Sequence, residues 1–287
     1  MNLLYITFGK DSSIHLQAVY SIASFIKQPS FVKRVVVITD EPSMYQLIQS
    51  SITLKVVDAA ILKEWKGPHQ FFWRIKIKGI EWVANTFPGE AVVYADTDTF
   101  LTESAMNFAL ALQSNTAFMH ENEGPLALKN SKTERKMWQQ VNGKQFGSYL
   151  INKNNAMWNA GIVAFPNNTN AAEIQLALAI CDDMCAKGVT PRLIEQFALS
   201  VALSHHYSMQ EAKHFIKHYW SAKTIWNKAL MQLFSTYLLQ NLTAQQIITS
   251  LSQLPLQYLP IGMKEKNTAR RLKKWVDKLF PTKTNNQ

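Results

Sequence analysis

The first half of the chain alternates uninterrupted apolar runs with segments of helical apolar spacing. Runs made of Val, Ile and Leu throughout are typical of strands buried on both faces of a sheet. Helices between such strands are the connections that parallel neighbours need. The pattern predicts strands at residues 3–8, 35–39, 53–57 and 91–95, with helices at 14–26 and 71–87. It indicates an α/β fold with a mostly parallel central sheet flanked by helices.

The second half of the chain has a less regular pattern, but it also predicts an α/β fold. Residues 124–155 are polar with little periodicity, and we expect a long loop region there. The remaining pattern predicts strands at 117–120, 162–165 and near 215–219, and helices at 171–186, 195–203 and 226–254. We therefore predict one domain over residues 1–225, with halves 1–115 and 116–225, then a C-terminal helical extension at 226–262 and a tail at 263–287.

Composition excludes several classes of protein. The 287 residues are 47% hydrophobic and 17% charged, which is unlike a disordered or collagen-like chain. The apolar runs are far shorter than the ~20 residues of a membrane-spanning helix, and we expect the first run to be a buried strand rather than a signal peptide. The two cysteines, Cys181 and Cys185, predict a reducing compartment and a cytoplasmic protein.

Most of the net charge of +10 lies at the end of the chain. Residues 263–287 hold eight basic and two acidic side chains, so they carry +6 and leave +4 for the preceding 262 residues. A nucleic-acid-binding domain usually spreads its basic residues over one face of the fold. We therefore expect no nucleic-acid partner.

Asp96 and Asp98 directly follow the predicted strand at 91–95, within VVYADTDTFL. Two residues apart in an extended chain, their carboxylates point to one side. They repel each other unless a cation neutralises them, and hard oxygen ligands suit Mg²⁺ or Mn²⁺. An Asp-X-Asp pair also occurs as an ordinary turn whose carboxylates bond their own backbone. The pair is thus a candidate metal site whose meaning depends on its context.

Two classes of enzyme carry such a motif. It matches the nucleophile loop of haloacid-dehalogenase-like phosphohydrolases, in which Asp96 would attack phosphorus. That family usually places this strand first and needs a second acidic pair at a later strand end. Here three strand-like segments precede the motif, and the later pair, Asp182 and Asp183, lies in a helical pattern. The motif also resembles the Asp-X-Asp motif of nucleotide-sugar glycosyltransferases with the GT-A fold, especially family 8 and its relatives. The context favours this second interpretation.

The resemblance extends over residues 3–223 and includes the segment HYWSAK at 218–223. It implies that His218 completes a metal site with Asp96 and Asp98, and that Lys223 contacts the diphosphate of the donor. Neutral imidazole is a suitable third ligand beside two carboxylates, and an ammonium group suits phosphate. The segment has Ser and Ala where the family usually has Gly, and its spacing from His to Lys is one residue shorter.

Two further segments resemble family motifs that position the sugar. WNAGIVAFP at 158–166 looks like an Asn-Ala-Gly strand entry, and IEQF at 194–197 looks like an Asp-Gln pair with Glu in place of Asp. The resemblance implies catalytic roles for Asn159, Glu195 and Gln196, which would orient the sugar or stabilise developing charge. A loop before a strand and a solvated helix start are the structural alternatives for these segments.

The front of the chain supplies candidate donor-binding residues. Thr7 and Asp40 end the first two predicted strands, where the family binds the nucleoside, although each can also cap the helix that follows. Arg74 lies in the helix before the Asp-X-Asp strand, where relatives often carry a donor-contacting Arg. Lys78 lies one turn later on the same face. The pair would neutralise diphosphate or would simply be solvated.

Together these features predict a GT-A-like, metal-dependent glycosyltransferase. Its cofactor would be Mn²⁺ or Mg²⁺, its donor a nucleotide sugar (usually a UDP-sugar in this family), and its acceptor a saccharide or lipid-linked saccharide. Three alternatives stay open: His205 or His206 as the third metal ligand, a phosphohydrolase, and a non-enzymatic basic protein that binds lipid or nucleic acid. The sequence identifies no dedicated base, so it leaves open whether the anomeric configuration is retained or inverted.

The tail predicts a contact with an anionic membrane surface. Its apolar side chains recur with helical spacing, and most basic side chains lie off that stripe. A basic amphipathic helix with aromatic residues on its apolar face is typical of an in-plane membrane anchor. The apolar stripe consists of Leu272, Trp275, Val276, Leu279 and Phe280. We expect a cytoplasmic protein that is peripheral on the inner face of a membrane; the alternative is a helix that docks on the domain.

The two forces in such an anchor respond differently to salt. Each basic residue near an anionic surface contributes about 1 kcal/mol, and salt screens this attraction. Reversing Lys273 and Lys274 to Glu should therefore weaken sedimentation with anionic vesicles mainly at low ionic strength, whereas Trp275→Ser should weaken it at all ionic strengths. Removal of residues 263–287 should release the protein and leave its melting temperature unchanged. Aggregation or unfolding of that truncated protein would instead mean that the stripe packs on the domain.

Overall fold

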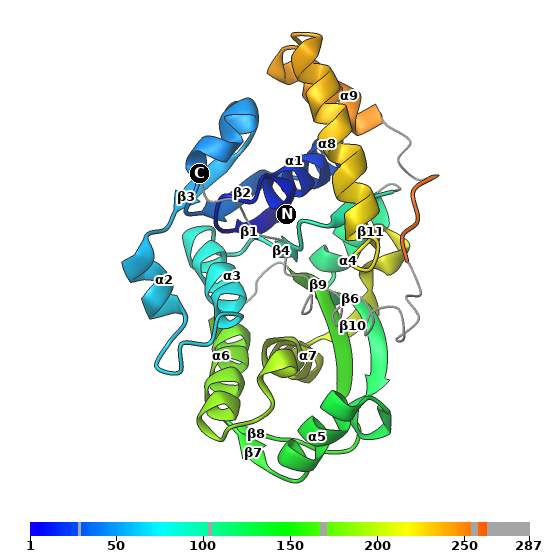
Figure 1. Ribbon diagram of the computed structural model, residues 1–287. Coiled ribbons are helices and arrows are strands. Elements are labelled where there is room, and N and C mark those ends of the chain that lie inside the picture. Colours follow the sequence, from blue (N-terminus) through cyan, green and yellow to red (C-terminus); the bar gives the residue numbers. More distant parts are fainter. Residues whose placement is uncertain (28–29, 103–104, 167–170, 254–257, 263–287) are drawn as a thin grey trace, which may run out of the picture.

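The computed structural model describes residues 1–27, 30–102, 105–166, 171–253 and 258–262 (Figure 1). The tail predicted at 263–287, with its amphipathic stripe, lies outside the described residues.

The central sheet is built from seven strands: β1 (Asn2–Thr7), β2 (Arg34–Thr39), β3 (Thr53–Val56), β4 (Val92–Ala95), β6 (Thr116–Pro125), β9 (Ala156–Phe165) and β10 (Ser208–Glu211). Their spatial order is β10-β6-β9-β4-β1-β2-β3. Strands β1 to β4 are parallel to one another, and β10 is parallel to β6, whereas β9 is antiparallel to both its neighbours. The order β3-β2-β1-β4 is that of a doubly wound nucleotide-binding sheet.

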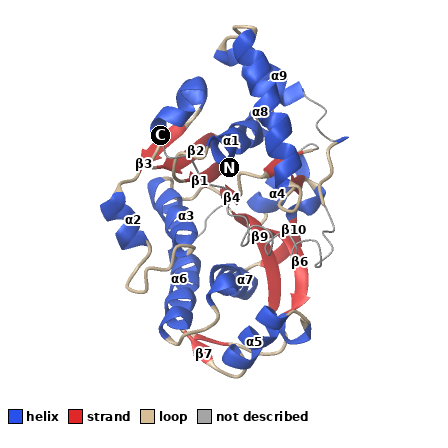
Figure 2. Ribbon diagram, in the orientation of Figure 1, coloured by secondary structure: helices blue, strands red, loops and turns tan. Residues whose placement is uncertain are grey.

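Helices cover both faces of this sheet (Figure 2). In chain order they are α1 (Ser12–Ile26), α2 (Ala59–Trp65), α3 (Arg74–Thr86), α4 (Met106–Gln113), α5 (Lys132–Val141), α6 (Ala171–Ala186), α7 (Ile194–His206), α8 (Lys223–Leu239) and α9 (Ala244–Gln253). One hydrophobic core lies between the sheet and α3, α6 and α7, and a second lies between the opposite face and α1, α4, α8 and α9. The sheet is thus a middle layer with apolar residues on both faces.

Strand β1 illustrates why the apolar runs are continuous. Leu4 belongs to the core beside α3, whereas Leu3 and Tyr5 belong to the core beside α1. All three side chains are fully buried, because successive residues of a strand point to opposite faces and both faces are covered. The predicted fold class is confirmed in its architecture: a mostly parallel α/β sheet flanked by helices, with the C-terminal helices α8 and α9.

The expected loop region at 124–155 is partly wrong, because it contains α5 and a short hairpin of β7 (Gln145–Phe146) and β8 (Tyr149–Leu150). Helix α5 begins with a capping box, in which the Ser131 hydroxyl accepts a hydrogen bond from the Glu134 amide at 3.2 Å. Its buried stripe is narrow, with Met137 and Val141 as its buried residues. A stripe of this size leaves little periodicity in the sequence, although the spacing of Ser131 and Glu134 indicates a helix start.

The C-terminal extension packs on the second core. Trp226, Leu230 and Phe234 lie on one side of α8 and are buried against the layer that contains α1. In α9, Ile247, Ile248 and Leu251 form a similar face. Within the described ranges, none of the helices combines the length and apolar character needed to span a membrane.

Candidate metal and donor site

The candidate site lies at the carboxyl end of β4, near the middle of the sheet. Asp96 and Asp98 occupy the turn between β4 and β5 (Thr99–Leu101). Two backbone contacts fix this turn: the Asp96 amide donates to the Gly161 carbonyl at 2.8 Å, and the Thr99 hydroxyl donates to the Asp96 carbonyl at 2.7 Å. Both carboxylates therefore stand on backbone that is held from two sides.

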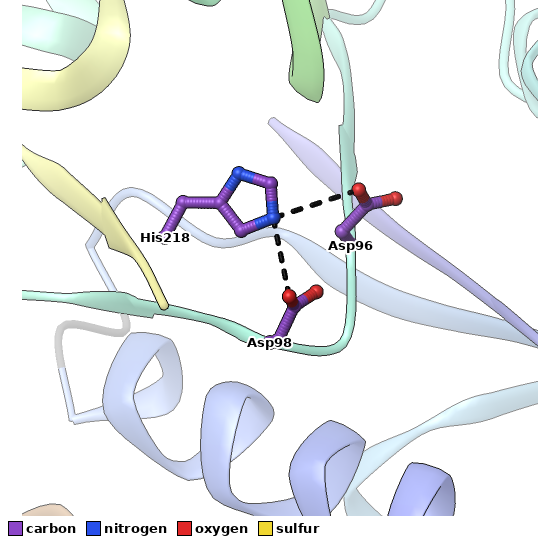
Figure 3. A group of neighbouring side chains, drawn as sticks. All are labelled: Asp96, Asp98 and His218. Atoms are coloured by element: carbon purple, nitrogen blue, oxygen red, sulfur yellow. Dashed lines mark ion pairs between the residues drawn. The ribbon is translucent and has the colours of Figure 1, made fainter. Parts of the chain in front are cut away.

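His218 reaches the same turn through strand pairing. It ends β11 (Ile216–His218), which pairs antiparallel with β5 so that His218 is opposite Thr99. Its Nε2 lies 3.3 Å from Asp98 Oδ2 and 3.8 Å from Asp96 Oδ2. Figure 3 shows the imidazole directed at both carboxylates. The three predicted metal ligands thus come together, with one ligand atom from each lying within 4.8 Å of the others.

Gly161 makes room for the imidazole. A Cβ atom at this position would lie 2.2 Å from His218 Nδ1 and 2.3 Å from its Cε1, much closer than van der Waals contact. Gly161 belongs to the Asn-Ala-Gly segment, and the structure gives that segment a physical role. The absence of a side chain at 161 allows His218 to approach the two carboxylates.

The chemistry of this group fits a divalent cation. Asp98 Oδ2 is buried, and the polar atoms nearest to it belong to ion-pair partners rather than to neutral hydrogen-bond donors. It faces the imidazole Nε2 and the nearby Asp96 carboxylate. Two carboxylates and one imidazole form an oxygen-rich donor set that suits Mn²⁺ or Mg²⁺. Asp96, Asp98 and His218 could therefore hold such an ion.

Two neighbouring side chains, His218 and Lys223, stabilise the charged form of Asp98. Burial by itself would raise the pKa of this carboxyl, but hydrogen bonding and charge from His218, followed by Lys223, outweigh it and lower the pKa to about 2. Lys223 begins α8, and its Nζ lies 3.1 Å from Asp98 Oδ2. The lysine is half exposed, whereas the carboxylate beneath it is almost fully buried. Lys223 therefore lies at the rim of the cluster, where a ligand can reach it.

Lys76, which belongs to none of the sequence motifs, lies largely buried beside the cluster. Lys76 Nζ is 3.0 Å from Glu195 Oε1 and 3.7 Å from Asp96 Oδ1, and it donates to the Ala160 carbonyl at 3.1 Å. It also lies over the Tyr94 ring, 4.6 Å from the ring centroid. Lys76 links α3, α7 and β4 at one point. The predicted catalytic residue Glu195 is thus connected to the metal cluster through this lysine.

Burial and neighbouring charges shift the pKa values of these groups. Burial disfavours the charged form of Lys76, but Asp96 and then Glu195 outweigh burial and raise its pKa, so the lysine stays protonated. Burial raises the pKa of Glu195, and Lys76 partly offsets that effect. Burial and the Asp96 charge raise the pKa of Tyr94. Tyr94 therefore remains a phenol and donates to Asp96 Oδ1 at 2.6 Å.

The predicted donor contacts Arg74 and Lys78 lie elsewhere on α3. Arg74 forms a two-pronged ion pair with Asp182 of α6, with Nε–Oδ1 at 2.7 Å and Nη2–Oδ2 at 3.0 Å. Lys78 pairs with Glu81, one turn along the same helix. Neither residue joins the carboxylate cluster in this structure, and their donor contacts stay predictions. Lys76 lies two positions from each of them, about 200° around the helix, and so faces the site.

Of the remaining predicted sugar-positioning residues, Asn159 lies beside the cluster through its contact with Gly161. Asn159 Oδ1 accepts from the Gly161 amide at 3.0 Å, and its Nδ2 faces Glu123 Oε1 at 3.4 Å. Burial raises the pKa of Glu123, and the Asn159 contact partly offsets this. Gln196 is half-buried in the first turn of α7, next to Glu195. The catalytic roles of these residues stay predictions.

Thr7 and Asp40 stabilise the loops at the strand ends. The Thr7 hydroxyl is hydrogen-bonded to the Tyr45 hydroxyl at 2.9 Å, and Asp40 Oδ1 accepts from the Gly9 amide at 2.9 Å. Thr7 also lines a cavity of about 230 Å³ beside the cluster. Aromatic side chains form much of its wall: Phe8, Phe72, Trp73 and Tyr94.

A buried amide connects the metal turn to α8. The Thr97 hydroxyl, between the two aspartates, donates to Gln17 Oε1 of α1 at 2.9 Å. Gln17 Nε2 donates in turn to Asn227 Oδ1 at 2.5 Å. Asn227 is one helical turn after Lys223, so this chain of hydrogen bonds fixes the start of α8 relative to Asp98. The sequence contained no motif that indicates this connection.

The alternative ligands and the second acidic pair lie away from the cluster. His205 and His206 end α7, where His205 contacts the Tyr149 ring at a centroid distance of 5.2 Å. Asp183 of α6 pairs with Lys187 at 3.2 Å, and Asp182 is occupied by the arginine described above. Within the described ranges, Asp96, Asp98 and His218 are the group of three metal-ligating side chains that lie close enough to share one ion.

Comparison with known proteins gives structural neighbours but no sequence relatives. No family model and no curated protein matches the chain. The structure is similar to that of the galactosyltransferase LgtC in complex with donor and acceptor sugar analogues, with a TM-score of 0.49, 9% identity and 74% of each chain covered. An active-site mutant of LgtC gives a TM-score of 0.47, 9% identity and coverage of 74% of this chain and 73% of that one. Both neighbours are glycosyltransferases, the class that the sequence resembles. At this level the similarity carries no argument about activity, which must rest on the site itself.

The contact between Gly161 and His218 makes a specific prediction. Gly161→Ala should displace the imidazole and lower Mn²⁺ affinity at least tenfold, while overpacking destabilises the fold by about 1–3 kcal/mol. Gly79→Ala is a matched control, because its Cβ would overpack against Ile6 in the core, 2.6 Å from that Cδ1, and away from the three ligands. Mn²⁺ titration followed by electron paramagnetic resonance, alongside thermal melts, separates the two effects. Equal loss of Mn²⁺ affinity in both variants would contradict the special role of Gly161.

Proposed function

We propose that this protein is a metal-dependent glycosyltransferase that uses a nucleotide-sugar donor. The observation that carries the proposal is the convergence of Asp96, Asp98 and His218 beside an aromatic-lined cavity at the carboxyl end of β4. In open α/β sheets this edge is where nucleotides bind. A cation there can bind the diphosphate of a nucleoside diphosphate, and the adjacent apolar cavity can hold its base.

The three ligands would hold Mn²⁺ or Mg²⁺ against the donor diphosphate. Such an ion supplies positive charge that stabilises the diphosphate as it leaves the sugar. Lys223 would add to this, since its ammonium group lies at the rim, 3.1 Å from Asp98, and remains half exposed. Phosphate oxygens are stronger partners for the lysine than a carboxylate that the metal has already neutralised.

The cavity would hold the base of the donor. Its aromatic walls give flat surfaces for stacking, and Thr7 supplies a hydroxyl at the end of β1. Tyr94 connects the cavity to the metal cluster, because it lines the cavity and donates to Asp96. A nucleoside in the cavity would therefore direct its diphosphate toward the metal. A uridine is the base that the family resemblance suggests.

The sugar would lie on the side of the cluster that faces α7 and β9. Lys76 holds Glu195 in position there by a 3.0 Å ion pair inside the protein. Gln196 follows in the first turn of α7, and Asn159 lies at the edge of β9. A carboxylate and two amides in this position can hold the sugar hydroxyls and stabilise positive charge at the anomeric carbon.

The acceptor that fits the whole chain best is a saccharide or a lipid-linked saccharide. The support for the lipid-linked form is the basic tail, whose charge suits an anionic membrane. We propose a cytoplasmic protein that binds peripherally to the inner face of a membrane. The low cysteine content and the concentration of positive charge in the tail both favour this location.

Hydrolysis of the donor tests the proposal directly. Purified protein should slowly release the nucleotide from one member of a nucleotide-sugar panel when Mn²⁺ is present, and chelation should stop the reaction. Asp98→Asn should lower this rate at least a hundredfold, because it removes a ligand charge from the buried cluster.

Asp183→Asn is the matched control, since it changes an aspartate that is ion-paired with Lys187, away from the cluster and from the predicted donor contacts. It should leave metal-dependent hydrolysis near the wild-type rate. A phosphohydrolase would instead cleave simple phosphomonoesters. Cleavage of phosphomonoesters without any activity on nucleotide sugars would overturn the proposal.

Gln196 is expected to act mainly in the transition state. Gln196→Ala should lower kcat more than tenfold and change the donor Kd less than threefold, because an amide beside the anomeric carbon matters most when charge develops. Steady-state kinetics with donor binding by calorimetry would separate the two quantities. A loss of donor affinity with unchanged kcat would place Gln196 among the binding residues instead.

A further inference from the structure

The hairpin of α8 and α9 has no charged residue beyond the second turn of α8, where Lys228 is the last one. Residues 229–263 contain no Asp, Glu, Lys, Arg or His, although 17% of the whole chain is charged and a segment of this length would hold about six such residues. From residue 229 onward, the exposed positions that the structure describes in this hairpin carry Gln, Ser, Thr, Asn, Leu and Met. Neutral side chains cost much less to remove from water than charged ones. The hairpin surface is therefore suited to a partner that excludes water.

Two leucines stand exposed at the tip of this hairpin. Leu238 is 75% exposed and Leu239 is 88% exposed, at the end of α8. Met231, also exposed, precedes Leu238 by seven residues and so lies on the same face of the helix. In Figure 1 the turn between α8 and α9 points away from the sheet and from the β6–β9 side of the molecule. The apolar tip is thus a projecting part of the fold.

The turn holds these leucines outward. Asn241 follows α8 in the left-handed region, with φ of 53°. Its amide donates to the Leu238 carbonyl at 3.0 Å, and the Leu242 amide donates to the Tyr237 carbonyl at 3.1 Å. This pair of bonds is a Schellman motif, which ends a helix in a fixed geometry. Exposure of Leu238 and Leu239 is therefore a property of a well-formed turn.

The opposite face of α8 is already occupied. Trp226, Leu230, Phe234 and Tyr237 are buried in the core that includes α1. The leucines at the tip cannot rotate into this core without breaking that packing. An exposed pair of large apolar side chains on a projecting element is typical of a membrane or protein contact.

The chain that follows the hairpin favours a lipid surface as the partner. Residues 258–262 return to the start of α8, where the Trp226 indole donates to the Pro260 carbonyl at 2.9 Å. The tail with net charge +6 begins there, one helix length, or about 25 Å, from the tip. About eight residues of extended chain span that distance, and the tail has 25. Tail and tip can therefore meet one bilayer together.

We propose that Leu238 and Leu239 insert into the interface of an anionic lipid bilayer as a second contact beside the tail. The inference extends the proposed membrane association and does not depend on glycosyl transfer. The tip would supply an apolar contribution that salt does not screen, and the tail an electrostatic one that salt weakens. Because residues 229–253 of the hairpin carry no charge, its tip can approach the edge of the hydrocarbon without the cost of bringing ions there.

Sedimentation of the full chain with vesicles tests this inference. The vesicles contain phosphatidylcholine and phosphatidylglycerol, and binding is measured at low and at high salt. The double variant Leu238→Ser with Leu239→Ser should lower the partition coefficient at least tenfold at both salt concentrations. The melting temperature should hardly change, because both side chains are exposed.

The matched control is the double variant Leu128→Ser with Leu150→Ser. These leucines are 73% and 59% exposed, but they lie outside the hairpin. Vesicle binding by this variant should equal that of the wild type. A second readout places an environment-sensitive dye on the full chain through Leu239→Cys, and its emission should shift to the blue when vesicles are added.

The possible outcomes distinguish membrane binding through the tip from binding through the tail, and both from the proposed enzyme activity. Unchanged binding by the variant with serines at 238 and 239, or no dye shift, overturns the inference even if charge reversal in the tail still weakens binding. A wild-type dimer in vesicle-free sedimentation that this variant dissociates would identify a second copy as the partner, and would also overturn it. Donor hydrolysis should be the same in wild type and variant, so failure of the proposed enzyme activity would be recognised separately.

Discussion

The site depends on the pairing of β5 with β11. This short antiparallel contact carries His218 across 120 residues of chain and sets it opposite Thr99, next to Asp98. Two further conditions make the pairing productive. Gly161 leaves space for the imidazole, and its carbonyl accepts the amide of Asp96, so one residue of β9 positions both sides of the cluster. Burying a histidine between two carboxylates costs free energy, because each group loses its hydrogen bonds to water. Contacts fixed this closely replace those hydrogen bonds inside the protein.

Charge is balanced in the site by two lysines with different access to solvent. Lys76 is enclosed between Asp96, Glu195 and the Tyr94 ring, whereas Lys223 lies half exposed over Asp98. The buried lysine is a permanent part of the fold, since leaving Glu195 without it would strand a charge inside the protein. The rim lysine can exchange its carboxylate for a phosphate at little cost. Under the proposed function, one lysine maintains the site and the other responds to the ligand.

The sequence predicted the elements with strong periodicity and the residues that belong to motifs. The strand before Asp96, the helix at 171–186 and the group of Asp96, Asp98 and His218 were all identified. Lys76 was not selected, because motif analogy pointed to the arginine two positions earlier and helix spacing then selected the opposite face. The Gln17 connection was also out of reach, since an isolated glutamine in a helix carries no signal of the partners that tertiary packing will give it. Helix α5 was missed because its buried stripe is narrow, although its capping box was visible.

Helix α8 brings together the chemistry and the proposed membrane contact. Its first two turns carry Lys223, Trp226 and Asn227, which contact the cluster, the Tyr219 ring and Gln17 respectively. Its middle turns bury apolar side chains against the body of the protein, and its last turn exposes Leu238 and Leu239. A helix held this firmly in the middle transmits little movement from one end to the other, because close packing resists displacement. Binding at the tip would therefore fix where the protein stands on the bilayer and leave the geometry around Asp98 unchanged.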